Sequence, residues 1–485
     1  MVLTPSVGGR IRLLSDRDVR DIDAASRSIL AKTGVQVGEK RLIEILVGSG
    51  AHADKEGRVT FPPRVIDDAL ESAPSRVLLH GRDGYPPLDL GGRRVYLGTG
   101  GAAIRILDLD DGHAREPRLS DLADIAWLVE HLEHVHFFLR PVVARDVPAS
   151  ALDLRKFYTC LLNTRKHVMG SAGTPEAAED VIDLAALVAG GEEALAASPI
   201  ISFVASWMVS PLKLDVGACK VLATVVEHGV PVALSSAPVA GSTAPATLAG
   251  LLAQVHAEQL SGIVLAQAIR KGAPVLYGPV PAVADFHTMG YAGGAIESCL
   301  LNAACAQLAH SIEVPIYSDA GLTDSKIPDI QAGYEKGMNI LLIALAGGNY
   351  IHHSAGMLES MLAVAYEQYV IDNDINGMAL RALRGIEVSP EALAEEVVAS
   401  VGPGGHYLTH AHTLAHVRSN EYFVPTAADR QSRSAWEAAG SRDARERARG
   451  IARSILEGPR KQFVSSDVKR QIRNRFGLPS SASDV

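Results

Sequence analysis

The residues of this chain that could do chemistry form no familiar acid–base set. Most are rings, histidines and single charged groups near the ends of short apolar runs: Tyr96, Arg140, Trp207, Tyr277, Asp285, His287, Tyr291, Tyr317, Asp319, His352 and His353. Aromatic rings can enclose an alkylated ammonium group, because a cation gains about 0.5–2 kcal/mol over a ring face when water is excluded. Only 5% of the chain is aromatic, so several rings at these positions are notable; they fit either a pocket for a small organic cation or ordinary packing.

The apolar runs themselves alternate with helix-forming sequence between about residues 120 and 375. Seven are strand-like: His134–Arg140, His167–Ser171, Ile200–Ala205, Pro231–Ser236, Pro274–Tyr277, Val314–Ser318 and Asn349–His353. An eighth strand is expected at Val95–Leu97 or Ala103–Leu107. Apolar strands separated by helices predict a parallel sheet buried on both faces. We therefore predict an α/β fold, a (β/α)8 TIM-type barrel, with a doubly wound sheet as the alternative.

In such a barrel every strand ends on the same face, and the loops there carry the chemistry. Adjacent strand residues point to opposite sides, so at most one of His352 and His353 is expected to face the barrel mouth. A loop rich in glycine and proline follows Tyr277 and leads to Asp285 and His287. Rigid loops at strand ends often position ligand groups.

Helical sequence flanks the predicted barrel on both sides. Residues 1–90 are predicted to be a helical cap, with helices at Ser15–Gly34, at Gly38–Ser49 and from Pro63 to Ser72. Residues 91–378 are expected to form the barrel core. Residues 379–485 read as a charged C-terminal helical extension that packs on the barrel or on a sister subunit.

Composition restricts the partners and the compartment. The formal charge of −9 and the pI near 6.0 argue against nucleic acid as a partner. The four cysteines form no C-x-x-C pair, which is typical of reduced packing residues in a cytoplasmic protein. No signal-like start and no charge-free span of about 20 residues are visible, so no membrane association is expected. The long tail favours a homo-oligomer.

Two motifs suggest other chemistry. The run Gly98–Gly101 has the glycines of a dinucleotide site, but Ile104–Asp110 alternates like a strand and offers no helix N-terminus for a pyrophosphate. A tight turn is the better interpretation. His412 and His416 have the i, i+4 spacing of metal ligands on a helix, but no acidic partner accompanies them. We expect a structural polar cluster between tail and barrel there, and no metal site.

Several segments together resemble the trimethylamine methyltransferase family. They are Tyr277–Pro279, Gly321–Lys326, Asp329–Glu335, Gly405–Leu408 and His412–Leu414. The string T-D-S-K-x-x-D-x-Q-A-G-Y-E, which spans residues 323–335, is the most specific of them. The tail, with Trp436, Gly440 and Arg447, is also similar, so the resemblance covers nearly the whole chain.

The resemblance implies a barrel enzyme that binds a small methylated amine and presents one N-methyl group to the Co(I) of a separate corrinoid protein. The partner would supply the corrinoid, and this chain would bind no cofactor tightly. Positioning, desolvation and cation stabilisation would be the chain's contribution, which fits the lack of a nucleophile–base pair.

Family members named for trimethylamine carry pyrrolysine, whereas relatives without it act on quaternary amines such as glycine betaine. This sequence has only standard residues, so a betaine-like quaternary amine is the expected donor, with a tertiary methylamine as the alternative. Betaine-using relatives align an arginine where this chain has Tyr317, and Asp319 follows closely. The substrate is therefore expected either to lack a carboxylate or to have it held by Arg140 or His352.

Roles for the site residues follow from the resemblance and from their positions. Asp285, His287 and His352 are expected to orient the substrate as catalytic residues. The substrate-binding set is expected to be Tyr96, Arg140, Trp207, Tyr277, Tyr291, Tyr317, Asp319 and His353. Two other functions remain open: a metal-dependent barrel lyase or aldolase with Asp285, His287 and His352 as ligands, and a non-catalytic betaine-binding protein.

Overall fold

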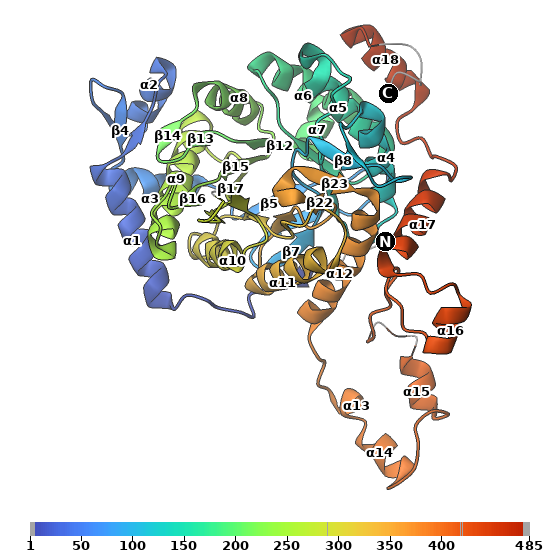
Figure 1. Cartoon of the computed structure of the whole chain (residues 1–485). Coiled ribbons are helices and arrows are strands. Elements are labelled where there is room, and N and C mark those ends of the chain that lie inside the picture. The colour runs from blue at the N-terminus through green and yellow to red at the C-terminus, as the bar shows by residue number, and fades with distance from the viewer. Residues whose placement is uncertain (1–4, 289, 418, 420, 479–485) are drawn as a thin grey trace.

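The structure is a computed structural model that describes residues 5–288, 290–417, 419 and 421–478. Strands lie at the centre with helices around them, and part of the C-terminal region extends away from the body (Figure 1). The predicted α/β class is confirmed.

Eight parallel strands, here called the core strands, carry the site. One sheet orders β10 (Phe137–Leu139), β11 (His167–Gly170), β12 (Ile201–Ala205), β15 (Val232–Ser236) and β17 (Val275–Pro279). A second orders β7 (Arg94–Leu97), β21 (Tyr350–His352) and β20 (Tyr317–Asp319), with β1 (Ser6–Val7) antiparallel to β7. Single parallel bridges, Gly98 to Phe137 and Tyr277 to Ile316, connect the two sheets. Each of the seven predicted runs overlaps a core strand, and β7 is the eighth.

Helices connect successive core strands, so the carboxyl ends of all eight strands face the same side. These helices are α4 (Leu119–Glu130), α5 (Ala149–Asn163), α6 (Pro175–Ala189), α7 (Glu192–Ala197), α8 (Val216–Glu227), α9 (Leu248–Ile269), α10 (Ile296–Ser311) and α11 (Ile330–Ala346). Helix α12 (Tyr366–Arg384) follows the last core strand, β21. Helix α9 is long and apolar enough to cross a membrane, but 78% of that stretch is buried inside the protein. We conclude that α9 is a core helix.

Two small sheets extend from the carboxyl ends of the core strands. One orders β16 (Val239–Ala240), β18 (Ala282–Ala284) and β19 (Tyr291–Ala292). The other orders β22 (Met357–Leu358), β23 (Ala363–Ala365), β8 (Arg105–Leu107) and β9 (Ala114–Arg115), with the short helix η1 (Glu359–Met361) between β22 and β23. The second candidate for the eighth strand, Ala103–Leu107, therefore lies outside the core strands.

The N-terminal region contains the three expected helices, α1 (Asp16–Lys32), α2 (Lys40–Gly48) and α3 (Pro63–Ser72). It also contains strands that the sequence patterns did not predict, because runs of two to four residues are too short to show an alternation. Strands β2 (Val35–Gln36), β4 (Arg58–Thr60) and β3 (His52–Ala53) continue the sheet begun by β13 (Met208–Val209) and β14 (Lys213–Leu214). Strands β5 (Arg76–Leu79) and β6 (Leu88–Gly91) form a hairpin.

The C-terminal region divides into an arm and a returning segment. The arm holds α13 (Pro390–Leu393), α14 (Glu395–Val401) and α15 (Ala411–His416), and it protrudes below the body in Figure 1. Helix α16 (Arg433–Ala438) follows, and then α17 (Ala444–Leu456) and α18 (Ser466–Phe476) return to the body. Trp127 of α4 donates to the Ile455 carbonyl, and Glu367 accepts from Arg445 and Arg449. The arm carries the C-terminal histidines, so the polar cluster expected between tail and barrel is not formed there.

Candidate functional site

Four aromatic rings lie together among the core strands and are here called the aromatic floor. Tyr317, Tyr350 and Tyr96 are register partners on β20, β21 and β7. The Phe137 ring of β10 stacks on Tyr350 with 3.5 Å between ring centroids, and Tyr317 lies 5.6 Å from Tyr350. All four belong to one buried cluster. Phe137, Tyr350 and Tyr317 thus form a stack across neighbouring strands, and Tyr96 is the register partner of Tyr350 on β7.

His352 lies on this floor. Its ring stacks on Tyr317 with 3.8 Å between centroids and 18° between planes. Burial, and after it the neighbouring His353, lowers the pKa of His352 well below its usual value, so the ring is neutral. Neither ring nitrogen has a hydrogen-bond partner among the described residues. Buried polar atoms are normally paired, so both nitrogens are available to a ligand.

Asp319 and His353 adjoin His352. The Nδ1 atom of His353 lies 2.7 Å from a carboxylate oxygen of Asp319, and both side chains are 6% exposed. The expectation that alternation would separate the two histidines is wrong, because His353 has a φ of +63° and the extended geometry ends at His352. The two rings are 4.2 Å apart. A Cβ at Gly100 would lie 2.6 Å from the His353 backbone nitrogen, so the glycine turn makes room for this arrangement.

Tyr291 reaches the same region from β19. Burial raises the pKa of its phenol well above the usual value, and the nearby carboxylates of Asp319 and Asp324 raise it further. The Tyr291 carbonyl accepts from the Ser360 hydroxyl, which also bonds to Asp324. Asp324 accepts from the Gly293 amide at 3.0 Å. These contacts tie the Tyr291 backbone to Asp324, in the loop after β20.

The string at residues 323–335 forms the frame that holds this loop. Glu335 of α11 accepts from the Thr323 hydroxyl and, at 2.9 Å, from the Asp324 amide. Lys336, the next residue, is fully buried and donates to the carbonyls of Gly321 and Met357. The most specific sequence motif therefore positions the loop after β20 and leaves the ligand-facing groups to other residues.

Arg140 follows β10 and lies at the rim of the same interior. Its guanidinium donates to the Ser171 hydroxyl at 3.1 Å, and it lines a cavity of 210 Å³. Burial lowers the pKa of Arg140, whereas electrostatic interactions with Cys160, Asp153 and Tyr317 raise it. Arg140 and Tyr317 are thus near enough to influence each other.

Three of the aromatic rings predicted to bind the substrate contact other parts of the chain. The Tyr277 hydroxyl lies 2.9 Å from Nδ1 of His256 on α9, so this ring faces the helix layer. Trp207 packs on α9, where a Cβ at Gly262 would lie 2.5 Å from the indole. Tyr96 joins the floor, but its hydroxyl accepts from the Asp89 amide of β6. The structure therefore does not gather Tyr277 and Trp207 with Tyr317 and His352.

Asp285 and His287 lie on an exposed loop. Asp285 accepts from the backbone amides of His287 at 2.7 Å and Thr288 at 3.0 Å, so its carboxylate closes a local turn. No hydrogen bond or ring contact between described residues joins either side chain to Asp319 or His352. Sequence reasoning also missed Phe137 and Tyr350 of the floor. Residues two apart in a strand point to the same face, and this alternation could have identified Tyr350, which precedes His352 by two residues.

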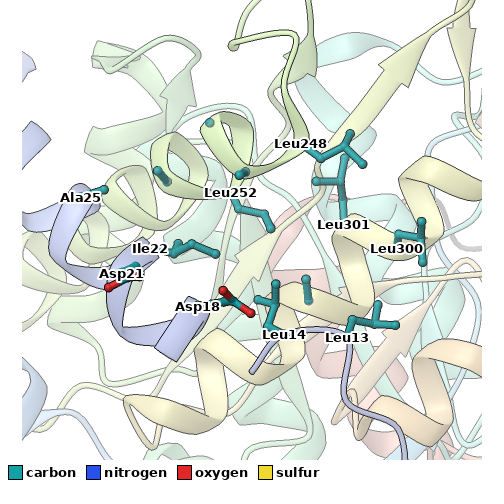
Figure 2. Close-up of a pocket in the computed structure, with 14 residues that line it drawn as sticks. Leu13, Leu14, Asp18, Asp21, Ile22, Ala25, Leu248, Leu252, Leu300 and Leu301 are labelled. Carbon is teal, nitrogen blue, oxygen red and sulfur yellow. The ribbon is translucent and has the colours of Figure 1, made fainter. Parts of the chain in front are cut away.

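A second cavity, of 680 Å³, lies between α1, α9 and α10 (Figure 2). Its lining is mainly apolar and includes Leu14, Ile22, Leu252 and Leu301. The charged side chains at its edge are Asp18 and Asp21. None of the predicted site residues borders it, so it offers no support for the chemistry expected at the strand ends.

Comparison with known proteins gives one consistent result. The family model described as trimethylamine methyltransferase (MTTB) matches residues 6–476. A glycine betaine methyltransferase of Desulfitobacterium hafniense (strain Y51) is 34% identical over 429 residues, which is 88% of each chain. The trimethylamine methyltransferase MttB of Methanosarcina thermophila is 34% identical over 470 residues, covering 96% of this chain and 97% of that one.

Among solved structures, the monomethylamine methyltransferase MtmB of Methanosarcina barkeri aligns with a TM-score of 0.46 at 13% identity and covers 91% of this chain and 93% of that one. The family assignment rests on the sequence matches, which extend over nearly the whole chain at about one-third identity. The chain belongs to the trimethylamine methyltransferase family.

Proposed function

We propose that this chain transfers a methyl group from a small methylated amine to the Co(I) of a partner corrinoid protein in the cytoplasm. A betaine-like quaternary amine is the favoured donor, and a tertiary methylamine is the alternative. The observation that supports this best is the buried Asp319 carboxylate beside the stacked Tyr317 and His352. Ring faces and a carboxylate are the surroundings that stabilise a methylated ammonium ion out of water. We also propose that the two parallel sheets close into a (β/α)8 barrel around it.

In this proposal the chain binds, orients and desolvates the donor. Tyr317 and His352 contact the methyl groups, and Asp319, held by His353, balances the positive charge. The corrinoid supplies the cobalt that accepts the methyl group. As the carbon–nitrogen bond breaks, its electron pair stays on nitrogen, and a quaternary donor leaves as a neutral tertiary amine with no proton transfer. Such a reaction needs no general base from the chain.

The reaction can be tested with free Co(I) cobalamin, whose absorbance changes on methylation. Glycine betaine, choline, carnitine, proline betaine and trimethylamine would be offered in turn to the full chain. Turnover with one quaternary amine would support the proposal and name the donor. Calorimetric binding of an amine without transfer to free or protein-bound cobalamin would favour the non-catalytic betaine-binding protein.

Removing the Tyr317 ring should weaken cation binding by about 1–2 kcal/mol, because one ring face is lost. We expect Tyr317→Leu to raise the Kd of the methylated amine about 5- to 30-fold by isothermal titration calorimetry. Trp207→Leu is the matched control, since it removes a ring that packs on α9. The control should destabilise the fold and leave the Kd unchanged. Equal effects of the two variants on the Kd would remove Tyr317 from the cation site.

A second candidate function is a metal-dependent lyase or aldolase. Ligand-capable atoms of Asp319, His352 and His353 lie within 4.8 Å of one another. Two histidines and a carboxylate are a donor set that divalent transition metals accept. This cluster replaces the expected set, since Asp285 and His287 do not join His352. Stoichiometric metal in the purified protein, lost in His352→Ala, would favour this function over methyl transfer.

We further propose that the arm docks on a second copy of the chain. The arm exposes large apolar side chains: Ile386, Val388, Leu393, Val398, Leu408, Leu414 and Val417. Its helices have only four to seven residues, and isolated helices that short are unstable in water. Helix α11 offers a complementary exposed face with Ile330, Tyr334 and Met338.

Light scattering should therefore find a dimer or a larger assembly. The double variant Leu408→Ser, Leu414→Ser should dissociate it, because both side chains are more than 60% exposed on the arm. Val209→Ser, which changes an exposed apolar residue of β13, is the control and should leave the assembly intact. A monomeric parent chain would contradict the proposal.

A further inference from the structure

The cavity beside Arg140 is unusual in its charge. It has a volume of 210 Å³ and lies where β10 and β11 end against the first turns of α5. Its polar lining is Arg140, Asp153, Lys156 and Ser171. Strands β10 and β11 are parallel neighbours of the core, so the cavity is on the side where the loops after β20 and β21 also lie.

The charges in this cavity do not balance. Lys156 is 4% exposed, and its ammonium lies 2.5 Å from the Asp153 carboxylate, so these two neutralise each other. Among the described residues, the Ser171 hydroxyl is the only side-chain acceptor for Arg140, and the buried Nε atom of Arg140 has no partner. Within the part of the chain that the structure describes, no carboxylate lies at ion-pair distance from Arg140. One positive charge is left over.

An arginine cannot remove this charge by losing its proton, because guanidinium stays ionised in proteins. A partly buried charge without a counter-ion is costly to the fold, and such groups are normally paired. The planar fork of Arg140 matches a carboxylate, which can accept two parallel hydrogen bonds from it. A monoanion balances the single excess charge, whereas a dianion such as phosphate would overcompensate it.

We infer that Arg140 is the receptor for an acidic group of the substrate, with the Lys156–Asp153 pair as a neutral wall beside it. This inference rests on the proposed function and deepens it. The methylated nitrogen lies on Tyr317 and His352, and a carboxylate reaches the Arg140 cavity. The donor is then a zwitterion, and the span between the two sites selects the spacer between its nitrogen and its carboxylate.

The test is a set of Kd values measured by isothermal titration calorimetry on the full chain. The ligands are trimethylammonio carboxylates with spacers of one to three carbons, and choline as the matched cation without an acid. One carboxylate should bind at least about 30-fold more tightly than choline. Arg140→Met should abolish this preference and leave the choline Kd unchanged, and Arg140→Lys should restore part of it. Arg145→Met, an exposed arginine outside the cavity lining, is the control and should keep the preference.

Two results would overturn the inference. One is equal affinity of the parent chain for choline and every carboxylate; the other is a preference that survives in Arg140→Met. A misfolded variant would also fail to bind choline. The choline Kd therefore distinguishes a structural defect from the loss of the Arg140 guanidinium. Failure of the proposed function is seen separately, as the absence of methyl transfer to Co(I) cobalamin from any amine. Methyl transfer from trimethylamine by the parent chain would keep the proposed function whatever the preference for acids.

Discussion

The Asp319→Asn variant should lose about 100-fold in kcat/KM for methyl transfer and still fold. Asparagine has nearly the same shape but removes the buried negative charge beside Tyr317 and His352. Loss of one partner from a desolvated charge pair costs about 2–5 kcal/mol, and about 2.7 kcal/mol corresponds to 100-fold. The substrate cation would then lie beside Tyr317 and His352 without its counter-ion.

The loss should appear in KM and in the Kd rather than in kcat. The positive charge on nitrogen declines as the carbon–nitrogen bond breaks, so Asp319 stabilises the bound donor at least as strongly as the transition state. Steady-state kinetics with Co(I) cobalamin would measure both constants, and thermal melting would confirm folding. A large fall in kcat at unchanged KM would contradict this role.

Asp285→Asn is the matched comparison, because it makes the same chemical change on the exposed loop. From its position we expect kcat and KM of this variant to stay within about two-fold of the parent values, since surface changes away from a site have small effects. A loss equal to that of Asp319→Asn would restore the catalytic role that the sequence suggested for Asp285.

Lys336→Met should lower the free energy of unfolding by about 3–5 kcal/mol, because it leaves the buried Asp372 carboxylate without its cation. The Lys336 ammonium lies 3.2 Å from Asp372, and both side chains are fully buried. Lys336 also joins the Gly321 and Met357 carbonyls, which flank the loops after β20 and β21. The variant should therefore loosen the site as well as the fold. Urea unfolding followed by circular dichroism would measure the change.

Two further variants make this result interpretable. The double change Lys336→Met, Asp372→Leu removes both charges and should recover most of the lost stability, because the penalty comes from the unpaired carboxylate. Arg433→Met breaks an exposed pair with Glu437, whose side chains are 80% and 54% exposed, and should cost less than about 1 kcal/mol. If Lys336→Met cost no more than Arg433→Met, the buried pair would not hold the site together.

The strand pattern was predictable because its cause is local. Each core strand is a short apolar run, and each ends near a polar or aromatic residue that the residue types mark directly. Each of the seven runs therefore overlaps a core strand. The eighth core strand could not be identified from local sequence, because Val95–Leu97 and Ala103–Leu107 are equally β-prone. Only pairing with β21 selects Val95–Leu97.

Which way each ring points could not be predicted as well. Tyr277 and Tyr317 both occur in predicted strands, yet Tyr277 faces α9 and Tyr317 joins the aromatic floor. Side chains alternate along a strand, so a shift of one residue in where a strand sits turns a ring from the interior to the helix layer. Neither the residue types nor their places in the sequence indicate such a one-residue shift of a strand.

The sequence by itself determined the α/β class, the places where strands end and the family, because these depend on apolar periodicity and on a contiguous motif. Tertiary structure decided which side chains meet. His353 comes beside His352 through a positive φ that histidine does not encode, and Asp319 joins them from a neighbouring strand. No carboxylate among the described residues lies at ion-pair distance from Arg140, whereas Asp153 pairs with Lys156 on α5. The Asp319–His353 contact joins residues 34 positions apart in the chain, so the packing of the whole molecule sets it.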